Sequence, residues 1–350
     1  MKILITGSSG LIGSESVEYF GRKGHEIIGI DNNLRKFFFG EQGDTTWILK
    51  RLQNMGIRFT HLDVDIRDRQ KILDIYKEYK PDTTIHCAAQ PSHDLAAKMP
   101  FEDFDTNAVG TVNLLEASRI FTHDSPFVFM STNKVYGDAP NKLELVETDT
   151  RWNYKDPAFY NGIPENFCID QTKHSLFGAS KVAADIMTQE YGQYFDMPTV
   201  CFRGGCLTGP SHSGVELHGF LSYLVKVAVQ GDKYTIFGYK GKQVRDQIHS
   251  ADVVKAFECF MKDPDCGVVY NLGGGRENSA SVLECLYILE KSFGCKVNYS
   301  LSEKNRIGDH ICYISDLNKF KSRYMNWNIS ISLREIIKKL FDSQKQRHLQ

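Results

Sequence analysis

The stretch that decides the fold is residues 3–13, which read ILITGSSGLIG. An apolar strand pattern runs directly into Gly7, Gly10 and Gly13, and residues 14–23 continue with the spacing of an amphipathic helix. Strand, glycine loop and helix in this order place a pyrophosphate on the N-terminus of the helix. The first glycine allows the tight turn, the second the close approach of phosphate, and the third the close packing of helix on strand. The stretch therefore predicts a dinucleotide-binding unit.

An acidic residue follows the next predicted strand. Residues 27–30 are apolar and end at Asp31, 18 positions after Gly13. A carboxylate there accepts hydrogen bonds from the adenosine ribose and repels a 2′-phosphate, which favours NAD over NADP. Asp65, after a third short strand at residues 58–62, is suited to accept from the adenine amino group or, equally, to act as a turn or cap residue.

Outward from the glycine loop, short apolar runs alternate with longer amphipathic segments. The predicted buried strands are residues 3–5, 27–30, 85–89, 127–130 and 200–202, and the clearest predicted helices are 107–121 and 180–195. This alternation predicts an α/β fold, a doubly wound parallel sheet with helices on both faces.

The alternation weakens after about Cys206. From there Gly-rich turns such as GYKGKQVRD and NLGGGRENS mix with short helices, of which residues 281–293 are an example. We expect residues 1–205 to form the NAD-binding Rossmann domain and residues 206–350 to form mainly a smaller α/β substrate lobe, with the chain crossing between lobes.

Composition excludes several classes of protein. The 350 residues carry 42 Lys+Arg and 43 Asp+Glu, a formal net charge of -1, so neither a basic nucleic-acid binder nor an acidic tail is indicated. Nine scattered cysteines without a CxxC pair suggest reduced thiols. No apolar stretch reaches the ~20 residues of a membrane span, and the N-terminus lacks the pattern of a signal peptide. We expect a cytoplasmic protein without nucleic-acid, membrane or metal partners.

Several motifs occur together in one order along the chain. These are HCAAQ at 86–90, Asn107 within DTNAVGT, STNKVYG at 131–137, Lys181, and QVRD at 243–246. With the glycine loop they resemble the extended short-chain dehydrogenase/reductase family that acts on nucleotide sugars, over nearly the whole chain. The blocks STNKVYGD and HSLFGASK most resemble the CDP-hexose 2-epimerases (CDP-paratose/CDP-tyvelose type) of that family.

The resemblance implies a chemistry and an assembly. Family members oxidise a sugar hydroxyl by hydride transfer to NAD, and these epimerases serve surface polysaccharide synthesis. Family members pair through two long helices, here 107–121 and 180–195, which implies a homodimer or homotetramer.

The resemblance also assigns catalytic positions. A Ser/Thr hydroxyl orients the sugar, a tyrosinate takes its proton, and a lysine four residues later lowers the pKa of that tyrosine. Thr132 matches the first position and Lys181 the last, but Phe177 stands where the tyrosine is expected. Residues i and i+4 share a helix face, so the spacing itself is consistent with these roles.

Phe177 has no ionisable group and is unable to act as a general base. Three explanations remain open: a Tyr→Phe change made to trap a substrate complex, a natural branch with another base, or a protein that binds NAD without catalysis. The other candidate bases, ranked with the histidine three residues before Phe177 first, are His174, Lys134, Cys206, Tyr136 and His218.

The residues after Thr132 bear on the reaction. Asn133 and Lys134 offer no carboxylate, whereas 4,6-dehydratases and decarboxylases of the family carry acidic groups there. A ketone at C4 acidifies C3 and C5 but not C2, so inversion at C2 suggests a transient 2-keto sugar. The predicted function is NAD-dependent C2 epimerisation of a CDP-hexose. The alternatives are a nucleotide-sugar dehydrogenase that releases NADH and a non-catalytic NAD-binding protein.

The remaining site expectations follow from the motif positions. The expected NAD contacts are Gly7, Gly10, Leu11, Ile12, Gly13, Asp31, Asn32, Asn33, Arg35, Asp65, Ile66, Ala88, Ala89, Gln90, Asn107 and Lys181. The expected substrate contacts are Gln90, His93, Thr132, Asn133, Arg203, His218, Gln243, Arg245 and Arg306, with the arginines suited to diphosphate oxygens.

Overall fold

A computed structural model describes residues 1–212, 219–303 and 309–348, and it divides the chain into two compact units. The first unit comprises Met1–Val135, Ser175–Arg203 and Val253–Tyr270, and the second Tyr136–His174, Gly204–Asp252 and Asn271–Gln350. The change of unit after Arg203 lies close to the expected division at residue 205. Residues 136–174 nevertheless belong to the second unit, and residues 253–270 return to the first.

The first unit is built on a seven-stranded sheet with the strand order β12-β8-β5-β4-β1-β2-β3. The strands are β1 Lys2–Thr6, β2 Glu26–Ile30, β3 Phe59–Leu62, β4 Thr83–His86, β5 Phe127–Thr132, β8 Thr199–Gly204 and β12 Val268–Leu272. The ladders from β3 through β2, β1 and β4 to β5 are parallel. The order reverses between β1 and β4, and a doubly wound sheet binds its ligand at such a switch point. The predicted doubly wound α/β fold is confirmed.

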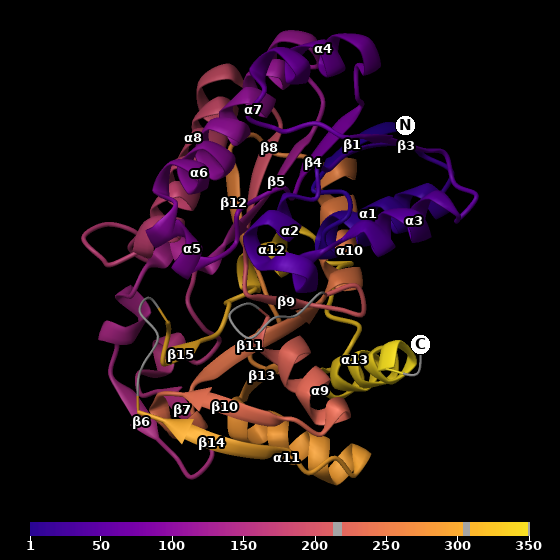
Figure 1. Cartoon of the computed structure of the whole chain (residues 1–350). Helices are drawn as coiled ribbons and strands as arrows, with labels where there is room; N and C mark the ends of the chain where they lie inside the picture. The colour runs from indigo at the N-terminus through magenta and orange to yellow at the C-terminus, as the bar shows by residue number, and fades with distance from the viewer. Residues whose placement is uncertain (213–218, 304–308, 349–350) are drawn as a thin grey trace. The chain divides into compact units, whose positions relative to one another are not determined.

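Helices flank this sheet, and Figure 1 shows α4, α7 and α8 along one side and α1 and α3 along the other. Their bounds are α1 Leu11–Arg22, α2 Leu34–Phe39, α3 Thr46–Gln53, α4 Arg69–Tyr79, α5 His93–Lys98, α6 Pro100–Phe104, α7 Gly110–Phe121, α8 Ser175–Phe195 and α10 Ser250–Lys262. The strands pack against them through fully buried side chains such as Leu4, Ile28 and Phe129.

Two predicted helix starts differ from the structure. The helix expected from residue 107 begins as α7 at Gly110, after a π-helical turn at Asp105–Val109. The helix expected from residue 180 begins five residues earlier, at Ser175. The Ser175 hydroxyl accepts a hydrogen bond from Gly178 N at 3.3 Å, which satisfies a backbone donor of the first turn as an N-cap does.

The second unit contains three small sheets and a separate apolar core. Its strands are β6 Leu145–Glu147, β7 Trp152–Tyr154, β9 Cys206–Thr208, β10 Lys233–Phe237, β11 Val244–His249, β13 Ser279–Ser281, β14 Asn298–Ser302 and β15 Cys312–Tyr313. Its helices are α9 Phe220–Gln230, α11 Val282–Phe293, α12 Asn318–Arg323 and α13 Leu333–His348. Side chains of α9, β10, α11 and α13 form the core, including Leu224, Ile236 and Ile337.

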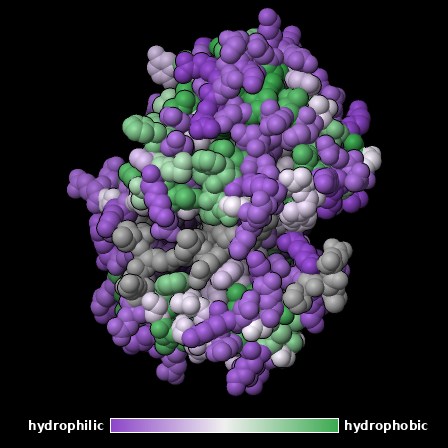
Figure 2. Space-filling model, viewed as in Figure 1, coloured by the Kyte–Doolittle hydropathy of each residue, from purple (hydrophilic) through white to green (hydrophobic). Residues whose placement is uncertain are grey.

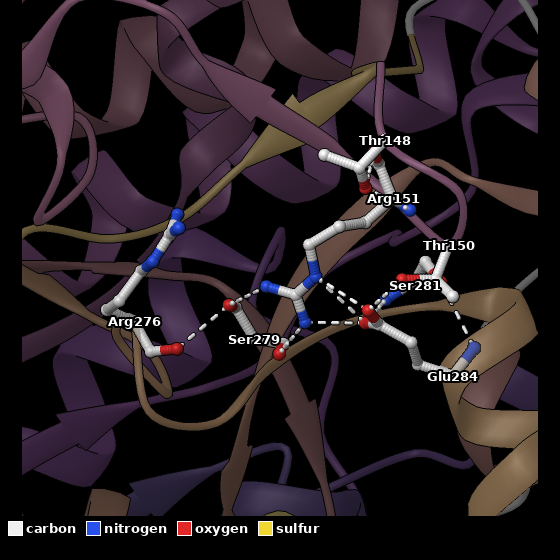
Figure 3. Close-up of polar contacts among 7 residues, drawn as sticks. All are labelled: Thr148, Thr150, Arg151, Arg276, Ser279, Ser281 and Glu284. Atoms are coloured by element: carbon white, nitrogen blue, oxygen red, sulfur yellow. Dashed lines mark hydrogen bonds and ion pairs between the residues drawn. The ribbon is translucent and has the colours of Figure 1, made fainter. Parts of the chain in front are cut away.

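An arginine clamp fastens the β6–β7 hairpin segment within this unit. The guanidinium of Arg151 donates to the Glu284 carboxylate, with Nε 2.8 Å from Oε1, and its Nη2 donates to the Ser279 carbonyl at 2.8 Å (Figure 3). Glu284 also closes a capping box with Ser281 at the start of α11. One carboxylate therefore both caps a helix and anchors the turn that leads into β7.

Within residues 1–212, 219–303 and 309–348, no helix combines the length and the apolar character that a membrane crossing requires.

Candidate active site

The glycine loop leaves no room for side chains. Gly7 has φ +66°, and a Cβ there would lie 2.8 Å from Ala88 N. A Cβ on Gly13 would lie 1.9 Å from the Gly7 carbonyl oxygen, so the third glycine lets α1 approach the loop. Gly10 donates its N–H to the Gly7 carbonyl at 2.8 Å and precedes α1 without a side-chain cap. The first N–H groups of α1 are therefore available to an anionic ligand at the positive end of the helix.

Asp31 lies where β2 ends, beside this loop. Its carboxylate accepts from Ser9 N at 2.9 Å and from Asn33 N at 2.8 Å. Burial raises the pKa of Asp31, and the two backbone donors oppose that rise. Asn33 adopts φ 52°, so the chain turns sharply directly after the carboxylate. Asp31 thus holds the glycine loop as well as facing the position predicted for the ribose.

The residues expected around the adenine are linked to one another. Asn32 Nδ2 donates to the Asp65 carboxylate at 3.2 Å, and Arg67 forms an ion pair with the same carboxylate at 2.6 Å. Burial opposes ionisation of Asp65, but the Arg67 hydrogen bonds lower its pKa overall. Arg35 packs over the Phe39 ring at 4.7 Å, and burial lowers its pKa to about 10.

Ile66 and Ile12 are buried among apolar side chains, and Leu11 is half-buried at the first position of α1. A Cβ on Gly110 would lie 2.6 Å from Ile66 Cδ1, so α7 packs closely on the segment after β3.

A buried histidine organises the segment after β4. His86 Nδ1 lies 2.7 Å from Thr6 Oγ1, and its Nε2 lies 2.9 Å from Thr111 Oγ1. The N–H groups of Cys87 and Ala88 donate to Thr6 Oγ1 at 3.2 Å, so the threonine proton points to Nδ1. Burial holds the pKa of His86 well below its usual value. A neutral imidazole therefore joins β1 to the loop that carries Ala88 and the half-buried Ala89.

Gln90 and Asn107 lie in a buried polar network. Gln90 Nε2 donates to Asp103 at 2.7 Å and to the Ser92 carbonyl at 2.9 Å. Gln90 and Asn107 are each only 1% exposed. The Asn107 amide donates to Ser180 Oγ at 3.0 Å and accepts from Gln90 N at 2.9 Å. These hydrogen bonds link the loop after β4 to α8. The contacts of Gln90 and Asn107 with the cofactor or the substrate stay predictions.

Thr132 is the last residue of β5, and Lys181 lies in the second turn of α8. Lys181 Nζ donates to the Met130 carbonyl at 3.0 Å and lies 4.1 Å from the centre of the Phe129 ring. Burial lowers the pKa of Lys181 to about 8, although Asp185 opposes that shift. Thr132 is half-buried, and its Oγ1 accepts from Lys134 N at 3.2 Å. Asn133 is 6% exposed and lies next to the Thr132 hydroxyl.

Phe177 is buried on the first turn of α8, one helical turn before Lys181. Its ring meets the His93 ring edge to face, with 4.9 Å between the centroids. His93 begins α5, seven residues after β4 ends, and its Nδ1 lies 2.8 Å from Ser175 Oγ. An imidazole therefore lies against the ring that stands in place of the expected tyrosine.

Arg203 forms a buried ion pair. Its guanidinium lies 2.8 Å from the Asp185 carboxylate, and the two side chains are 4% and 1% exposed. Ser131 Oγ donates to the same carboxylate at 2.5 Å. Arg203 therefore joins β8 to α8 inside the first unit, and its contact with the substrate stays a prediction.

In the second unit, Arg245 is buried on β11 and forms an ion pair with Asp309 at 2.9 Å. Gln243 Nε2 donates to the Phe237 carbonyl at 3.2 Å, and its buried Oε1 has no hydrogen-bond partner among the described residues. The predicted substrate residues His218 and Arg306 lie outside the described residues. Both Arg245 and Gln243 remain predictions for the nucleotide sugar.

The alternative proton acceptors differ in position. Tyr136 is fully buried and its hydroxyl donates to Asn271 at 2.8 Å, a packing role. Cys206 lies on β9 in the second unit, and Lys134 is half-buried in the turn after β5. His174 precedes α8 and is not one helical turn from Phe177, because the helix begins at the next residue.

Comparison with known proteins assigns the family. A model of the NAD dependent epimerase/dehydratase family matches residues 3–273. The chain belongs to the NAD dependent epimerase/dehydratase family. CDP-paratose 2-epimerase of Salmonella typhi is 31% identical over 98% of this chain and 98% of its own length. Human UDP-glucose 4-epimerase is 27% identical over 99% and 97% of the two chains.

Solved structures of epimerases share the fold. UDP-glucose 4-epimerase from Thermotoga maritima, crystallised with UDP-glucose, superposes with a TM-score of 0.78 at 24% identity and covers 100% of this chain and 99% of its own. A tyrosine-to-phenylalanine mutant of UDP-glucuronic acid 4-epimerase from Bacillus cereus gives 0.81 at 24% identity, with 99% and 100% coverage.

The site fits the NAD that the family uses. Gly7 and Gly13 leave a loop that a Cβ would fill, α1 offers uncapped N–H groups, and Asp31 presents a carboxylate at the end of β2. These groups match pyrophosphate and ribose respectively. NAD is therefore the cofactor of this chain.

Sequence reasoning missed Asp103, Ser180 and Asp185. Ser180 Oγ donates to Asp103 at 2.6 Å, and this pair joins α6 to α8. Asp103 lies between the HCAAQ and DTNAVGT motifs, and nothing in its spacing indicates a contact with Ser180. Asp185 lies four residues after Lys181, so the two share a face of α8, and that spacing could have identified Asp185.

Proposed function

We propose that the protein inverts C2 of a CDP-linked hexose, with NAD as a cofactor that stays bound through turnover. The observation that carries this proposal is the 31% identity to CDP-paratose 2-epimerase across 98% of both chains. The turn after Thr132 supports an epimerase over a dehydratase, because Asn133 and Lys134 provide no carboxylate to remove a C5 proton or to protonate a leaving hydroxyl.

Each residue of the site has its own proposed role. The glycine loop, Asp31 and Lys181 would hold NAD, which when bound supplies an acceptor and donor of hydride to a sugar carbon. The Thr132 hydroxyl would orient the sugar oxygen at the end of β5. Asn133 lies beside it and would contact the sugar. Arg245, with its partner Asp309 in the second unit, is proposed for the diphosphate.

The chemistry at C2 sets a further condition. Since a ketone at C4 does not acidify C2, the proposal places the oxidation at C2 itself, followed by return of the hydrogen to the opposite face of the 2-keto sugar. No net redox change occurs, so the reaction consumes no added NAD.

The experiment is proton NMR of CDP-paratose and CDP-glucose incubated with the purified chain, with and without added NAD, while absorbance at 340 nm is followed. We expect inversion at C2 in both arms and no accumulation of NADH. A stoichiometric rise at 340 nm that depends on added NAD would instead establish the nucleotide-sugar dehydrogenase, the alternative reading of the same site.

Phe177 favours a second candidate, a protein that binds NAD without catalysis. That candidate predicts tight NAD binding and no change in any of the CDP-, UDP-, GDP- or dTDP-hexoses. Recovery of C2 inversion by Phe177→Tyr alone would identify the missing phenol as the reason for inactivity.

We also propose a homodimer or homotetramer formed through α7 and α8. Large apolar side chains are exposed on α6, α7 and α8, namely Phe101, Phe104, Ile120, Ile186 and Tyr194. Figure 2 shows green apolar surface among hydrophilic surface over this part of the first unit. Light scattering should give twice or four times the monomer mass, and Ile186→Lys should lower it. A monomer at micromolar concentration would contradict the proposal.

A further inference from the structure

The segment after β4 and the first turn of α8 bring an ionisable ring to the position where a tyrosine is missing. Phe177 and His93 meet edge to face at 4.9 Å between centroids. Phe177 is 7% exposed, whereas His93 is half-buried at the start of α5. The imidazole therefore lies closer to the accessible side of this contact than the phenyl ring does.

The ring of His93 is held in one orientation. Its Nδ1 lies 2.8 Å from Ser175 Oγ, and the same hydroxyl accepts from Gly178 N at 3.3 Å. The serine oxygen has two acceptor sites and one proton, so it is able to accept from Nδ1–H while it accepts from Gly178 N. The proposal below requires that tautomer, in which the basic atom of the imidazole is Nε2 and the Nδ1 hydrogen bond supports the imidazolium once Nε2 is protonated.

The surroundings place His93 at the correct edge of the sheet. β4 and β5 are neighbouring parallel strands, so their carboxyl ends, which lead to His93 and Thr132, lie at the same edge. The loop before His93 packs directly on the glycine loop, since a Cβ on Gly7 would lie 2.8 Å from Ala88 N. The buried network of Gln90, Asp103 and Ser180 fixes the segment against α8.

Lys181 is less suited to replace the tyrosine. Its Nζ is buried and donates to the Met130 carbonyl at 3.0 Å, so a hydrogen bond already fixes it against β5. His93 comes from α5 and contacts the first turn of α8, which carries Phe177, through Ser175.

We propose that Nε2 of His93 is the proton acceptor and donor of the reaction, in the role that a tyrosine at position 177 would otherwise fill. This inference rests on the proposed function. In the oxidation half, the O–H bond at C2 breaks and its proton passes to Nε2. NAD, when bound, would accept the C2 hydrogen together with its electron pair as hydride, so that the C2=O bond would form. In the reduction half the same proton returns to oxygen, so protons and electrons balance over one turnover.

Four proteins test it: the wild type, His93→Gln, His93→Gln with Phe177→Tyr, and His123→Gln as the matched control. His123 is an exposed histidine after α7 that lies 3.0 Å from Asp124. We expect His93→Gln to lose about 100-fold or more in kcat for C2 inversion, within the range for one general acid–base group, with NAD binding and Tm kept. We expect the control to match the wild type.

The double variant separates chemistry from structure. A tyrosine at position 177 stands one helical turn before Lys181, so we expect it to recover at least tenfold of the activity lost in His93→Gln. A double variant no better than His93→Gln overturns the proposal, because a structural defect is not repaired by a phenol. His93→Gln within threefold of the wild type also overturns it, while the wild-type inversion still supports the proposed function.

If the wild type inverts no CDP-hexose, the proposed function fails. A measurement that needs no turnover then still tests the role of His93. The ¹⁵N-histidine spectrum of the NAD-loaded protein, with His93→Gln for assignment, is recorded with saturating CDP-glucose and then UDP-glucose, and calorimetry confirms binding. We expect the Nε2 signal of His93 to shift and that of His123 to stay. An unmoved His93 signal with both bound ligands overturns the assignment.

Discussion

Two ends of the first unit contrast in how they are built. At the β1–β2 end, the glycine loop and Asp31 carry the groups suited to the pyrophosphate and the adenosine ribose within residues 7–31. At the β4–α8 end, Phe177 breaks the expected set, and the site depends on contacts between residues far apart in sequence, such as His93 with Ser175. A cofactor site is therefore a local property of this chain, whereas its acid–base chemistry is a property of tertiary packing.

The largest expected effect probes the β4–α8 end. Arg203→Met leaves the buried Asp185 carboxylate without its cation, and breaking a buried pair costs about 3 to 5 kcal/mol. Arg119→Met, which breaks an i,i+3 pair with Glu116 whose side chains are about one third exposed, should cost no more than about 1 kcal/mol. Urea unfolding of both variants measures the difference.

One result would support the predicted contact of Arg203 with the substrate. An Arg203→Met protein that unfolds at the same urea concentration as the wild type, but shows a raised KM for the CDP-sugar, contradicts a structural role.

At the β1–β2 end, Gly13→Ala should reduce NAD affinity by about 100-fold, which is about 3 kcal/mol. The added methyl would lie 1.9 Å from the Gly7 carbonyl oxygen, so the loop must move. Gly24→Ala is the control for a strained glycine replacement away from the loop. Its φ of +84° disfavours a side chain, but no atom lies within 4 Å of the added methyl, so we expect NAD affinity to be unchanged. Calorimetric titration with NAD gives both affinities, and equal affinities would show that the loop does not depend on this close approach.

At the β4–α8 end, the buried Lys181 ammonium should lower the free energy of unfolding at neutral pH. Its pKa is about 8 in the folded chain and about 10.5 when unfolded. Below pH 8 both states are protonated, and burial of the charge destabilises the fold by about 3 kcal/mol. As pH rises from 8 to 10.5, the folded state loses the proton first and this destabilisation fades.

The comparison with Lys181→Met isolates that effect. The free energy of unfolding of the wild type should rise relative to that of the variant by about 3 kcal/mol between pH 8 and pH 10.5. Urea midpoints at pH 7.5, 9 and 10.5 follow it. A difference that is independent of pH would mean that Lys181 titrates normally.

The smallest effect serves as a reference from the second unit. Arg151→Ala removes the clamp on Glu284, whose side chains are 19% and 23% exposed, and should cost about 1 to 2 kcal/mol (Figure 3). Lys155→Ala, in a more exposed pair with Glu144, should change stability by less than about 1 kcal/mol. Equal costs for the two variants in urea unfolding would show that partial burial adds nothing to the clamp.

The same contrast explains what the sequence could predict. The doubly wound sheet and the glycine loop follow from local patterns, because Gly7, Gly13 and Asp31 act through their own backbone and their immediate neighbours. The internal contacts of Gln90, Asn107 and Arg203 could not be predicted from the sequence. Their partners Asp103, Ser180 and Asp185 come from other elements. The spacing along the chain does not show that these side chains will form hydrogen bonds or ion pairs with one another. His93 was expected to face the sugar, but its contact with Phe177 depends on how α5 packs on α8.

The central claim is that a chain with phenylalanine at position 177 still epimerises C2 by transient oxidation. Its most direct test is CDP-paratose incubated with the wild-type protein in D₂O without added NAD, followed by NMR of C2. The account predicts an inverted C2 that keeps its original hydrogen, because the hydrogen leaves as hydride and returns from the same bound cofactor. An unchanged sugar, or an inverted C2 that carries deuterium from solvent, would contradict it.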